Sequence, residues 1–168
     1  VMYLTIGQEG FLVNVLFVCL GNICRSPTAE GVFRDLVTRE GLSHAISTDS
    51  AGTGDYHTGN PPDSRARAEA RKRGIDLSDL RARQAVPADF ETFDYVIAMD
   101  HSNQRNLAAI CPPGQESRLH MMMKFATTSG TAEVPDPYFG DAGFEKVLDM
   151  LEDASQGLLD HIRENDLT

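Results

Sequence analysis

The apolar positions of the chain fall into short runs, and amphipathic stretches separate one run from the next. Runs rich in β-branched, aromatic and other apolar residues predict buried strands, which are expected at 11–19, 45–49, 95–99 and 118–125. Stretches of helix-forming residues with start and stop signals predict helices, which are expected at 27–40, 61–73, 102–110 and 144–164. Strands that alternate with helices predict one α/β domain, built on a four-stranded parallel sheet with helices on both faces.

The junction between the first strand and the first helix is the expected site of function, because parallel sheets bind ligands beyond the carboxyl ends of their strands. The first strand ends at Cys19, and Gly21 follows in a predicted turn. Ser26 is expected to cap the helix, with Pro27 at its first position.

A chain of 168 residues is long enough for one domain and too short for two ordinary ones. We expect the domain to span 11–168 and residues 1–10, which begin with valine, to be a trimmed or added leader. No apolar stretch has the roughly 20 residues of a membrane-spanning helix. With no recognisable export or lipidation signal, the cytoplasm is the expected location.

The net charge of −10 argues against nucleic acid and anionic membranes as partners, because both attract basic proteins. An anionic substrate would need a local site that concentrates positive charge and hydrogen-bond donors. The three cysteines are too few for a disulfide-rich scaffold, and with the five histidines they fit no zinc-binding spacing. No metal is therefore expected, and the cysteines remain candidates for thiol chemistry.

The segment after the first strand has the composition of an oxyanion cradle. Successive backbone N–H groups of a tight turn, followed by a helix N-terminus, surround an anion with donors. Gly21 permits close approach of the backbone, and Asn22 tolerates the left-handed conformation that such a loop needs. The Arg25 guanidinium can donate to two oxygens of one phosphate group. The residues expected to surround the phosphate are Cys19, Leu20, Gly21, Asn22, Ile23, Cys24, Arg25 and Ser26.

Cys19 is the candidate nucleophile of this phosphate-binding loop. The surrounding positive charge favours the thiolate, and the Ser26 hydroxyl can donate a hydrogen bond to it. A lone cysteine at a strand end is more often a buried core residue. Here an arginine and a serine at fixed spacing, between a strand and a helix, favour the catalytic interpretation.

With these residues the chain resembles the low-molecular-weight protein tyrosine phosphatases. The resemblance extends from Val15 to about Leu159. A Cys-x5-Arg-Ser loop is shared with other phosphatases, whereas its N-terminal position and the downstream Asp136-Pro137-Tyr138 single out this family. The matching segments are 19–27, 49–53, 63–65, 82–84, 93–95, 99–103 and 136–140.

The resemblance implies that the chain hydrolyses phosphotyrosine in proteins through a phosphocysteine intermediate on Cys19, with Arg25 binding the phosphate. Asp136 would be the general acid of the first step and the general base of the second. From the residues alone, an Asp-Pro pair is usually only a turn. The resemblance also implies a reversible disulfide between Cys19 and Cys24. No metal or organic cofactor is needed, since the thiolate and the cradle supply the chemistry.

An aromatic rim is implied around a deep pocket. Tyr56, Tyr138 and Phe139 resemble this rim, which accepts a flat ring and excludes the shorter phosphoserine. Tyr56 stands where a tryptophan is often found in the family. Among the five histidines, His57 is the one expected to contact the substrate.

Supporting residues are implied as well. Ser50 and Asn22 resemble the residues that hold the loop, and Arg65 resembles a brace for it. Leu80 stands where many members have a histidine that hydrogen-bonds the loop asparagine, so the sequence leaves the support of Asn22 open. Asp100 is expected to be structural.

Three alternatives remain. A thiol-dependent arsenate reductase shares the fold but passes a disulfide along extra cysteines, and this chain has only Cys111 outside the loop. A protein arginine phosphatase has threonine where Ile23 stands. A phosphopeptide-binding module would not need Cys19, Arg25 and Asp136 together. The expected partners are phosphotyrosine-containing proteins, with a tyrosine kinase as a further candidate, while the sequence does not identify the physiological substrate or the oligomeric state.

Overall fold

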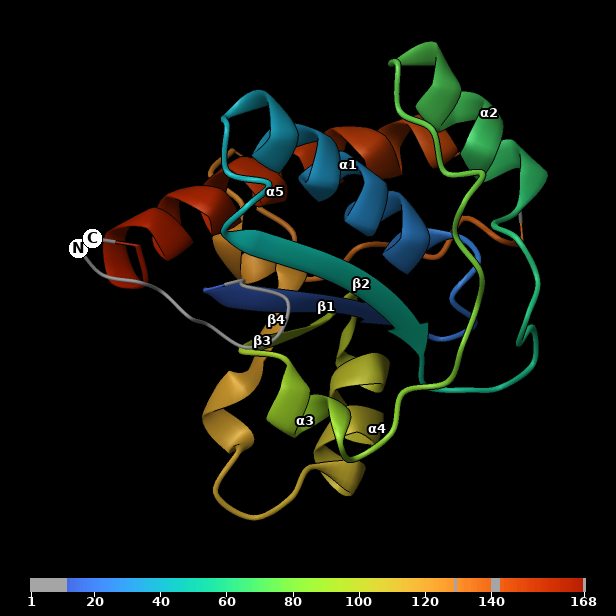
Figure 1. Cartoon of the computed structure of the whole chain (residues 1–168). Helices are drawn as coiled ribbons and strands as arrows, with labels where there is room; N and C mark the ends of the chain where they lie inside the picture. Colours follow the sequence, from blue (N-terminus) through green and yellow to red (C-terminus); the bar gives the residue numbers. More distant parts are fainter. Residues whose placement is uncertain (1–11, 129, 140–142, 168) are drawn as a thin grey trace.

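The computed structural model describes residues 12–128, 130–139 and 143–167, so the predicted leader at 1–10 and Gly140 of the last motif lie outside the described residues. The strands are β1 Val13–Cys19, β2 Ile46–Gly52, β3 Tyr95–Ala98 and β4 Leu119–Met121. They form one parallel sheet in the order β2-β1-β3-β4 (Figure 1). The predicted four-stranded parallel sheet is confirmed.

The helices cover both faces of this sheet. They are α1 Arg25–Arg39, α2 Ser64–Lys72, α3 Asp89–Thr92, α4 His101–Ile110 and α5 Phe144–Asn165, with two 3₁₀-helices, η1 Glu116–Arg118 and η2 Met122–Phe125. Helices α1 and α5 pack on one face with α2 beside them, and α3 and α4 lie on the other face (Figure 1). This confirms the predicted α/β architecture. Within the described residues, no helix has both the length and the apolar character that crossing a bilayer requires.

The central strand β1 is buried on both faces, which explains its nearly continuous apolar sequence. Val15 and Phe17 point into the core under α1 and α5. Leu16 and Val18 point the opposite way and pack with residues of α3 and α4. Because Cys19 ends this strand, packing on both faces fixes the position of its thiol.

Two boundaries near the predicted loop differ from expectation. Helix α1 begins at Arg25, so the prediction that Ser26 caps the helix is wrong. The Ser26 hydroxyl lies 3.0 Å from Cys19 Sγ instead, and it serves the loop rather than the helix end. Strand β2 continues past its predicted end at Asp49 to Gly52, because its last residues pair with β1.

Three further elements differ from the sequence prediction. Helix α2 begins later than predicted, at Ser64, because Asp63 caps it by accepting a hydrogen bond from Arg65 N at 2.8 Å. Strand β4 has only three residues, and the rest of the predicted strand forms η2. Helix α3 is absent from the sequence prediction, since its four residues are too few to show helical periodicity.

Candidate active site

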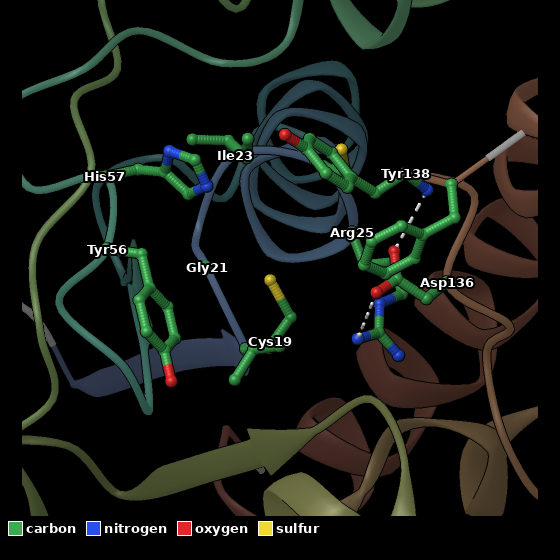
Figure 2. A pocket seen from close by; sticks show the side chains of 11 residues that line it. Cys19, Gly21, Ile23, Arg25, Tyr56, His57, Asp136 and Tyr138 are labelled. Atoms are coloured by element: carbon green, nitrogen blue, oxygen red, sulfur yellow. Dashed lines mark hydrogen bonds and ion pairs between the residues drawn. The ribbon is translucent and has the colours of Figure 1, made fainter.

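The cradle lies at the carboxyl end of β1 and forms part of a pocket with a volume of about 230 Å³. Figure 2 shows the Cys19 side chain between two walls, with Tyr56 and His57 on one side and Asp136 and Tyr138 on the other. The pocket is lined by Cys19, Leu20, Gly21, Ile23, Cys24, Arg25, Tyr56, His57, Asp136, Tyr138 and Phe139. Every one of these is a predicted site residue. The other four predicted residues, which do not line the pocket, are Asn22, Ser26, Ser50 and Arg65.

Two groups from the segment that follows Cys19 lie within hydrogen-bond distance of its thiol. The backbone N–H of Asn22 donates to Sγ at 3.3 Å, and the Ser26 hydroxyl lies 3.0 Å from the same sulfur. Asn22 has a φ of 59°, the left-handed conformation predicted for this position. Both groups are placed to donate a hydrogen bond to the sulfur.

The buried side chain of Asn22 connects the loop to two other segments. Its Nδ2 donates to Ser26 Oγ at 2.8 Å and to Ser50 Oγ at 3.0 Å. Its Oδ1 accepts a hydrogen bond from Arg83 N at 3.0 Å. Leu80 packs in a separate apolar cluster. The question that Leu80 raises is therefore answered, since Ser50 and the backbone at Arg83 support the loop asparagine.

The chain just beyond β2 holds the start of the loop through its backbone. Thr53 N donates to Cys19 O at 2.9 Å, and Gly54 N donates to Leu20 O at 3.0 Å. A Cβ atom at Gly52 would lie only 2.7 Å from Leu20 O. Glycine is therefore required for β2 to pass this close to the cradle.

The Arg25 side chain is anchored at one of its two terminal nitrogens. The residue is 2% exposed, and its Nη1 donates to Asp100 Oδ2 at 2.7 Å and to Val134 O at 3.0 Å. Its Nη2 lies 3.6 Å from Asp136 Oδ2 (Figure 2). Asp100 also caps α4 by accepting from Asn103 N at 2.7 Å. The structure thus orients the guanidinium through Asp100 and leaves Nη2 next to the Asp136 carboxylate.

Asp136 lies on a loop that is tied to the sheet and to α2. Val134 N donates to Met99 O, just beyond β3, at 2.8 Å. Arg65, near the start of α2, donates from Nη2 to Tyr138 O at 3.0 Å. These two contacts flank the carboxylate, and the second one places Arg65 where a brace of the loop is predicted.

The predicted rim side chains surround the mouth of the pocket. Tyr56 is 72% exposed and Phe139 is 83% exposed. The Tyr138 ring meets Phe139 edge-on, with centroids 5.0 Å apart, and its centroid lies 6.1 Å from that of His57. The described residues include six exposed large apolar side chains, and four of them line this pocket: Leu20, Tyr56, Tyr138 and Phe139. Such a concentration indicates a surface that accepts an apolar or aromatic group.

This arrangement can bind and transfer a phosphoryl group. The N–H groups of the cradle and Arg25 Nη2 are suited to an oxyanion, Cys19 is a nucleophile, and Asp136 can move a proton. In the part of the chain that the structure describes, no group of three or more His, Cys, Asp or Glu side chains could hold a metal ion.

Comparison with known proteins agrees with this chemistry. The sequence profile of the low molecular weight phosphotyrosine protein phosphatases matches residues 14–167. The chain belongs to this family. A low-molecular-weight protein-tyrosine-phosphatase of Bacillus subtilis is 41% identical over 152 residues, which cover 90% of this chain and 97% of that protein. A low-molecular-weight phosphotyrosine protein phosphatase of Schizosaccharomyces pombe is 44% identical over 152 residues, with coverages of 89% and 97%. A protein tyrosine phosphatase from Entamoeba histolytica, solved by crystallography, superposes with a TM-score of 0.88 at 43% identity, covering 90% of this chain and 97% of that chain.

Cys24 is the second thiol in the pocket of this phosphatase-family chain. Burial raises the pKa of its thiol to about 12, and the Asp63 carboxylate contributes to the rise. Cys24 therefore stays protonated near neutral pH, and a protonated thiol is a poor nucleophile. Both cysteines are free thiols in the structure, and the disulfide between them stays a prediction.

Sequence reasoning misses two carboxylates that this family member uses to hold its site. Asp100, expected to be only structural, orients Arg25. Glu30, buried on α1, accepts a hydrogen bond from Ser50 Oγ at 2.8 Å. The available signals were positional: Asp100 follows β3 at the same edge of the sheet as the cradle, and Glu30 lies one helical turn after Ser26.

The pKa of the Glu30 carboxyl is raised from 4.5 to about 7, chiefly by burial. The Asp49 and Asp79 carboxylates contribute to this rise, whereas the hydrogen bond from Ser50 and the charge of Arg34 oppose it. The folded protein consequently favours the neutral form of this side chain.

Glu30→Gln is therefore expected to stabilise the protein more at high pH than at low pH. The stability that native Glu30 contributes as a neutral group is fully present below pH 4.5 and is lost as the pH rises through about 7. Glutamine cannot ionise, so the free energy of unfolding of the variant relative to the native protein should increase by about 3 kcal/mol across this interval. Urea unfolding of both proteins at several pH values measures the difference. A difference that did not change with pH would contradict this expectation.

Proposed function

We propose that the chain removes phosphate from phosphotyrosine in proteins, with Cys19 as the nucleophile and Asp136 as the general acid and base. The observation that carries this proposal is the meeting of three groups in one pocket. A thiol with two donors lies beside the Arg25 guanidinium, and the Asp136 carboxylate lies 3.6 Å from that guanidinium. The Bacillus subtilis relative is named a protein-tyrosine-phosphatase, which supports the same activity here.

In the first step, the Cys19 thiolate attacks phosphorus and the bond from phosphorus to the tyrosine oxygen breaks. Asp136 gives its proton to the departing oxygen, so tyrosine leaves as a neutral phenol. The cradle N–H groups and Arg25 stabilise the charge on the phosphoryl oxygens while this happens. The phosphoryl group is then attached to sulfur.

In the second step, the Asp136 carboxylate takes a proton from a water molecule, and the water oxygen attacks phosphorus. The bond from phosphorus to sulfur breaks and inorganic phosphate forms. The leaving thiolate of Cys19 receives hydrogen bonds from Asn22 N and the Ser26 hydroxyl, which stabilise its charge. Asp136 ends the cycle protonated, ready for the next substrate.

The walls of the pocket favour an aromatic phosphate ester. Ile23 is buried in the lining, and the exposed rings of Tyr56 and Phe139 extend the walls outward from the cradle. A phosphate group on a phenyl ring can reach the cradle while the ring contacts these walls, whereas phosphoserine is shorter and has no ring to bury. We therefore propose phosphotyrosine-containing proteins as partners, among them a tyrosine kinase. We also propose the cytoplasm as the location.

The proposed domain spans 11–168. The family profile, which matches residues 14–167, supports these boundaries. The position of the cradle near the start of the matched region also agrees with one domain whose first strand carries the nucleophile.

A substrate panel tests the proposal. Initial rates are measured with a phosphotyrosine peptide, its phosphoserine and phosphoarginine counterparts, and arsenate with a thiol reductant. We expect hydrolysis of the phosphotyrosine peptide to exceed the other activities by at least about 100-fold. Faster hydrolysis of phosphoarginine, or reduction of arsenate, would assign the chain to one of the other enzyme classes. Tight binding of phosphotyrosine without turnover would make it a binding module.

Tyr56→Ala is expected to raise KM for a phosphotyrosine peptide about fivefold and to change kcat little, because the ring contributes binding rather than chemistry. Steady-state kinetics measure both constants. Val86→Ala is the matched control, since Val86 is also an exposed apolar side chain but lies outside the pocket. An unchanged KM in the Tyr56 variant would show that this ring does not contact the substrate.

A further inference from the structure

A buried chain of hydrogen bonds links the Cys19 thiol to a carboxylate outside the pocket. It runs from Sγ through Ser26, Asn22 and Ser50 to Glu30, with successive distances of 3.0, 2.8, 3.0 and 2.8 Å. The residues that follow Cys19 in this chain are all between 0 and 5% exposed. Glu30 is not among the residues that line the pocket, so it acts on the substrate only through the others.

One arrangement of the hydrogens of this hydrogen-bond chain directs a donor toward the sulfur. Arg83 N can only donate, so Asn22 Oδ1 faces it and the two Nδ2 hydrogens point to the two serine oxygens. Each serine hydroxyl can then donate outward, Ser26 toward the sulfur and Ser50 toward Glu30. The Ser26 hydroxyl has one more distant acceptor, a carbonyl of β2 at 3.3 Å.

On the basis of the function proposed above, we propose that Glu30 is a positioning residue: its carboxylate is the fixed acceptor that holds the Asn22 amide and the Ser26 hydroxyl in the orientation that presents a proton to Cys19. A carboxylate accepts hydrogen bonds and never donates them, so it permits only one direction for the Ser50 hydroxyl. That direction leaves the Ser50 oxygen free to accept from Asn22.

Protonation of Glu30 weakens this acceptor, because the neutral carboxyl keeps one acceptor oxygen and gains a hydrogen that it can donate. The Ser50 hydroxyl can then donate to Glu30 or accept from it, so its direction is no longer fixed. When the Ser50 hydroxyl turns away from Glu30, it orders the Asn22 amide less well, and the Ser26 hydroxyl can turn to the β2 carbonyl, so that the sulfur loses a donor. The neutral form of Glu30 thus weakens the support of the thiolate.

The charged groups around Glu30 come from three segments. They are Arg34 of α1, Asp49 of β2 and Asp79, and burial together with the two carboxylates gives Glu30 a pKa of about 7. Arg34 donates to Asp79 at 3.0 Å, and Asp49 forms an ion pair with Arg83 at 3.1 Å. Arg34 and Arg83 are therefore already paired with other carboxylates. With a pKa of about 7, Glu30 changes its protonation state near neutral pH.

Two substitutions at Glu30 separate its charge from its role as an acceptor. Glu30→Gln keeps an acceptor oxygen and cannot ionise, whereas Glu30→Leu has similar bulk and no acceptor. Asp35→Asn is the matched control. Asp35 is a carboxylate on the same helix, but it pairs with Arg39 and does not belong to the chain of hydrogen bonds. The measured quantity is kcat/KM for p-nitrophenyl phosphate between about pH 5.5 and 8, over which the substrate titrates in the same way for every protein.

The Gln variant should match the native protein near pH 5.5, where both side chains are neutral, and should be about fivefold less active than native near pH 8, where only the native carboxylate fixes the Ser50 hydroxyl. The Leu variant should be about fivefold less active than native near pH 8. In a Ser50→Ala background, Glu30→Leu should have no further effect, since the connection is already broken. Asp35→Asn should follow the native profile.

A ratio of Gln variant to native that stays constant with pH would overturn the proposal. It would also be overturned if the Gln variant exceeded the native protein near pH 8 and matched it near pH 5.5, since the negative charge itself would then oppose the anionic substrate. Additive losses from Ser50→Ala and Glu30→Leu would assign Glu30 a purely structural role.

The rate at which iodoacetamide alkylates Cys19, followed by mass spectrometry, repeats the test without turnover. The Gln and Leu variants should show the same pattern relative to native as in the kinetics. If the native protein failed to hydrolyse aryl phosphates, the proposed function would fail, and alkylation would still decide whether Glu30 positions the donors of Cys19.

Discussion

Replacing Cys19 by serine is expected to lower kcat for p-nitrophenyl phosphate by more than about 10⁴-fold, because the serine hydroxyl is not ionised near neutral pH and is a much weaker nucleophile than a thiolate. The two donors at the sulfur, Asn22 N and the Ser26 hydroxyl, stabilise a thiolate that the variant does not have. The measurement is steady-state turnover at several pH values.

The matched control for this loss is Cys111→Ser, which removes a thiol near the end of α4, outside the pocket. It should retain native turnover. The Cys19 variant should also retain its fold and its affinity for inorganic phosphate, because the cradle and Arg25 remain. Turnover within about tenfold of native in the Cys19 variant would show that another group attacks phosphorus.

Asp136→Asn should lower kcat by about 10²- to 10⁴-fold for substrates with a poor leaving group, because the proton for the departing oxygen is lost. The loss should be much smaller for p-nitrophenyl phosphate, whose phenolate leaves readily without a proton. Comparing this substrate with phenyl phosphate in both proteins therefore measures proton donation itself. Equal losses for the two substrates would indicate that Asp136 affects binding or structure.

Glu133→Gln provides the control for this second prediction. Glu133 precedes Asp136 on the same loop and is exposed, but it accepts a hydrogen bond from His101 N at 2.7 Å and does not line the pocket. Its replacement should leave the ratio between the two substrates unchanged.

The parts of the site that the sequence predicted are those whose chemistry is local. The strand that ends at Cys19, the turn at Asn22 and the position of Arg25 are set by neighbours in the chain, so spacing and residue type were sufficient. Asp136 differs, because an aspartate between prolines predicts only a turn, and the family resemblance was needed to assign it a catalytic role.

The parts that sequence reasoning missed depend on contacts between distant segments. Asp100 reaches Arg25 across 75 positions of the chain, and Glu30 reaches Ser50 across 20, so no local pattern predicts either contact. The prediction that Ser26 caps α1 failed for a related reason, because the Ser26 hydroxyl contacts the Cys19 thiol instead of the helix end. Boundaries such as the end of β2 were set by pairing with β1, which overrides the turn preference of its last residues.

The contact between Arg25 and Asp136 has a consequence for how an acidic protein receives an anion. A guanidinium that is 2% exposed would be costly to bury without counter-ions, and Arg25 has two, Asp100 at 2.7 Å and Asp136 at 3.6 Å. In the proposed reaction a phosphate pairs with Nη2 in place of Asp136, whose carboxyl then carries the proton that the leaving group needs. We therefore expect substrate binding to exchange one anion for another at Arg25, so that the local charge of the pocket changes little.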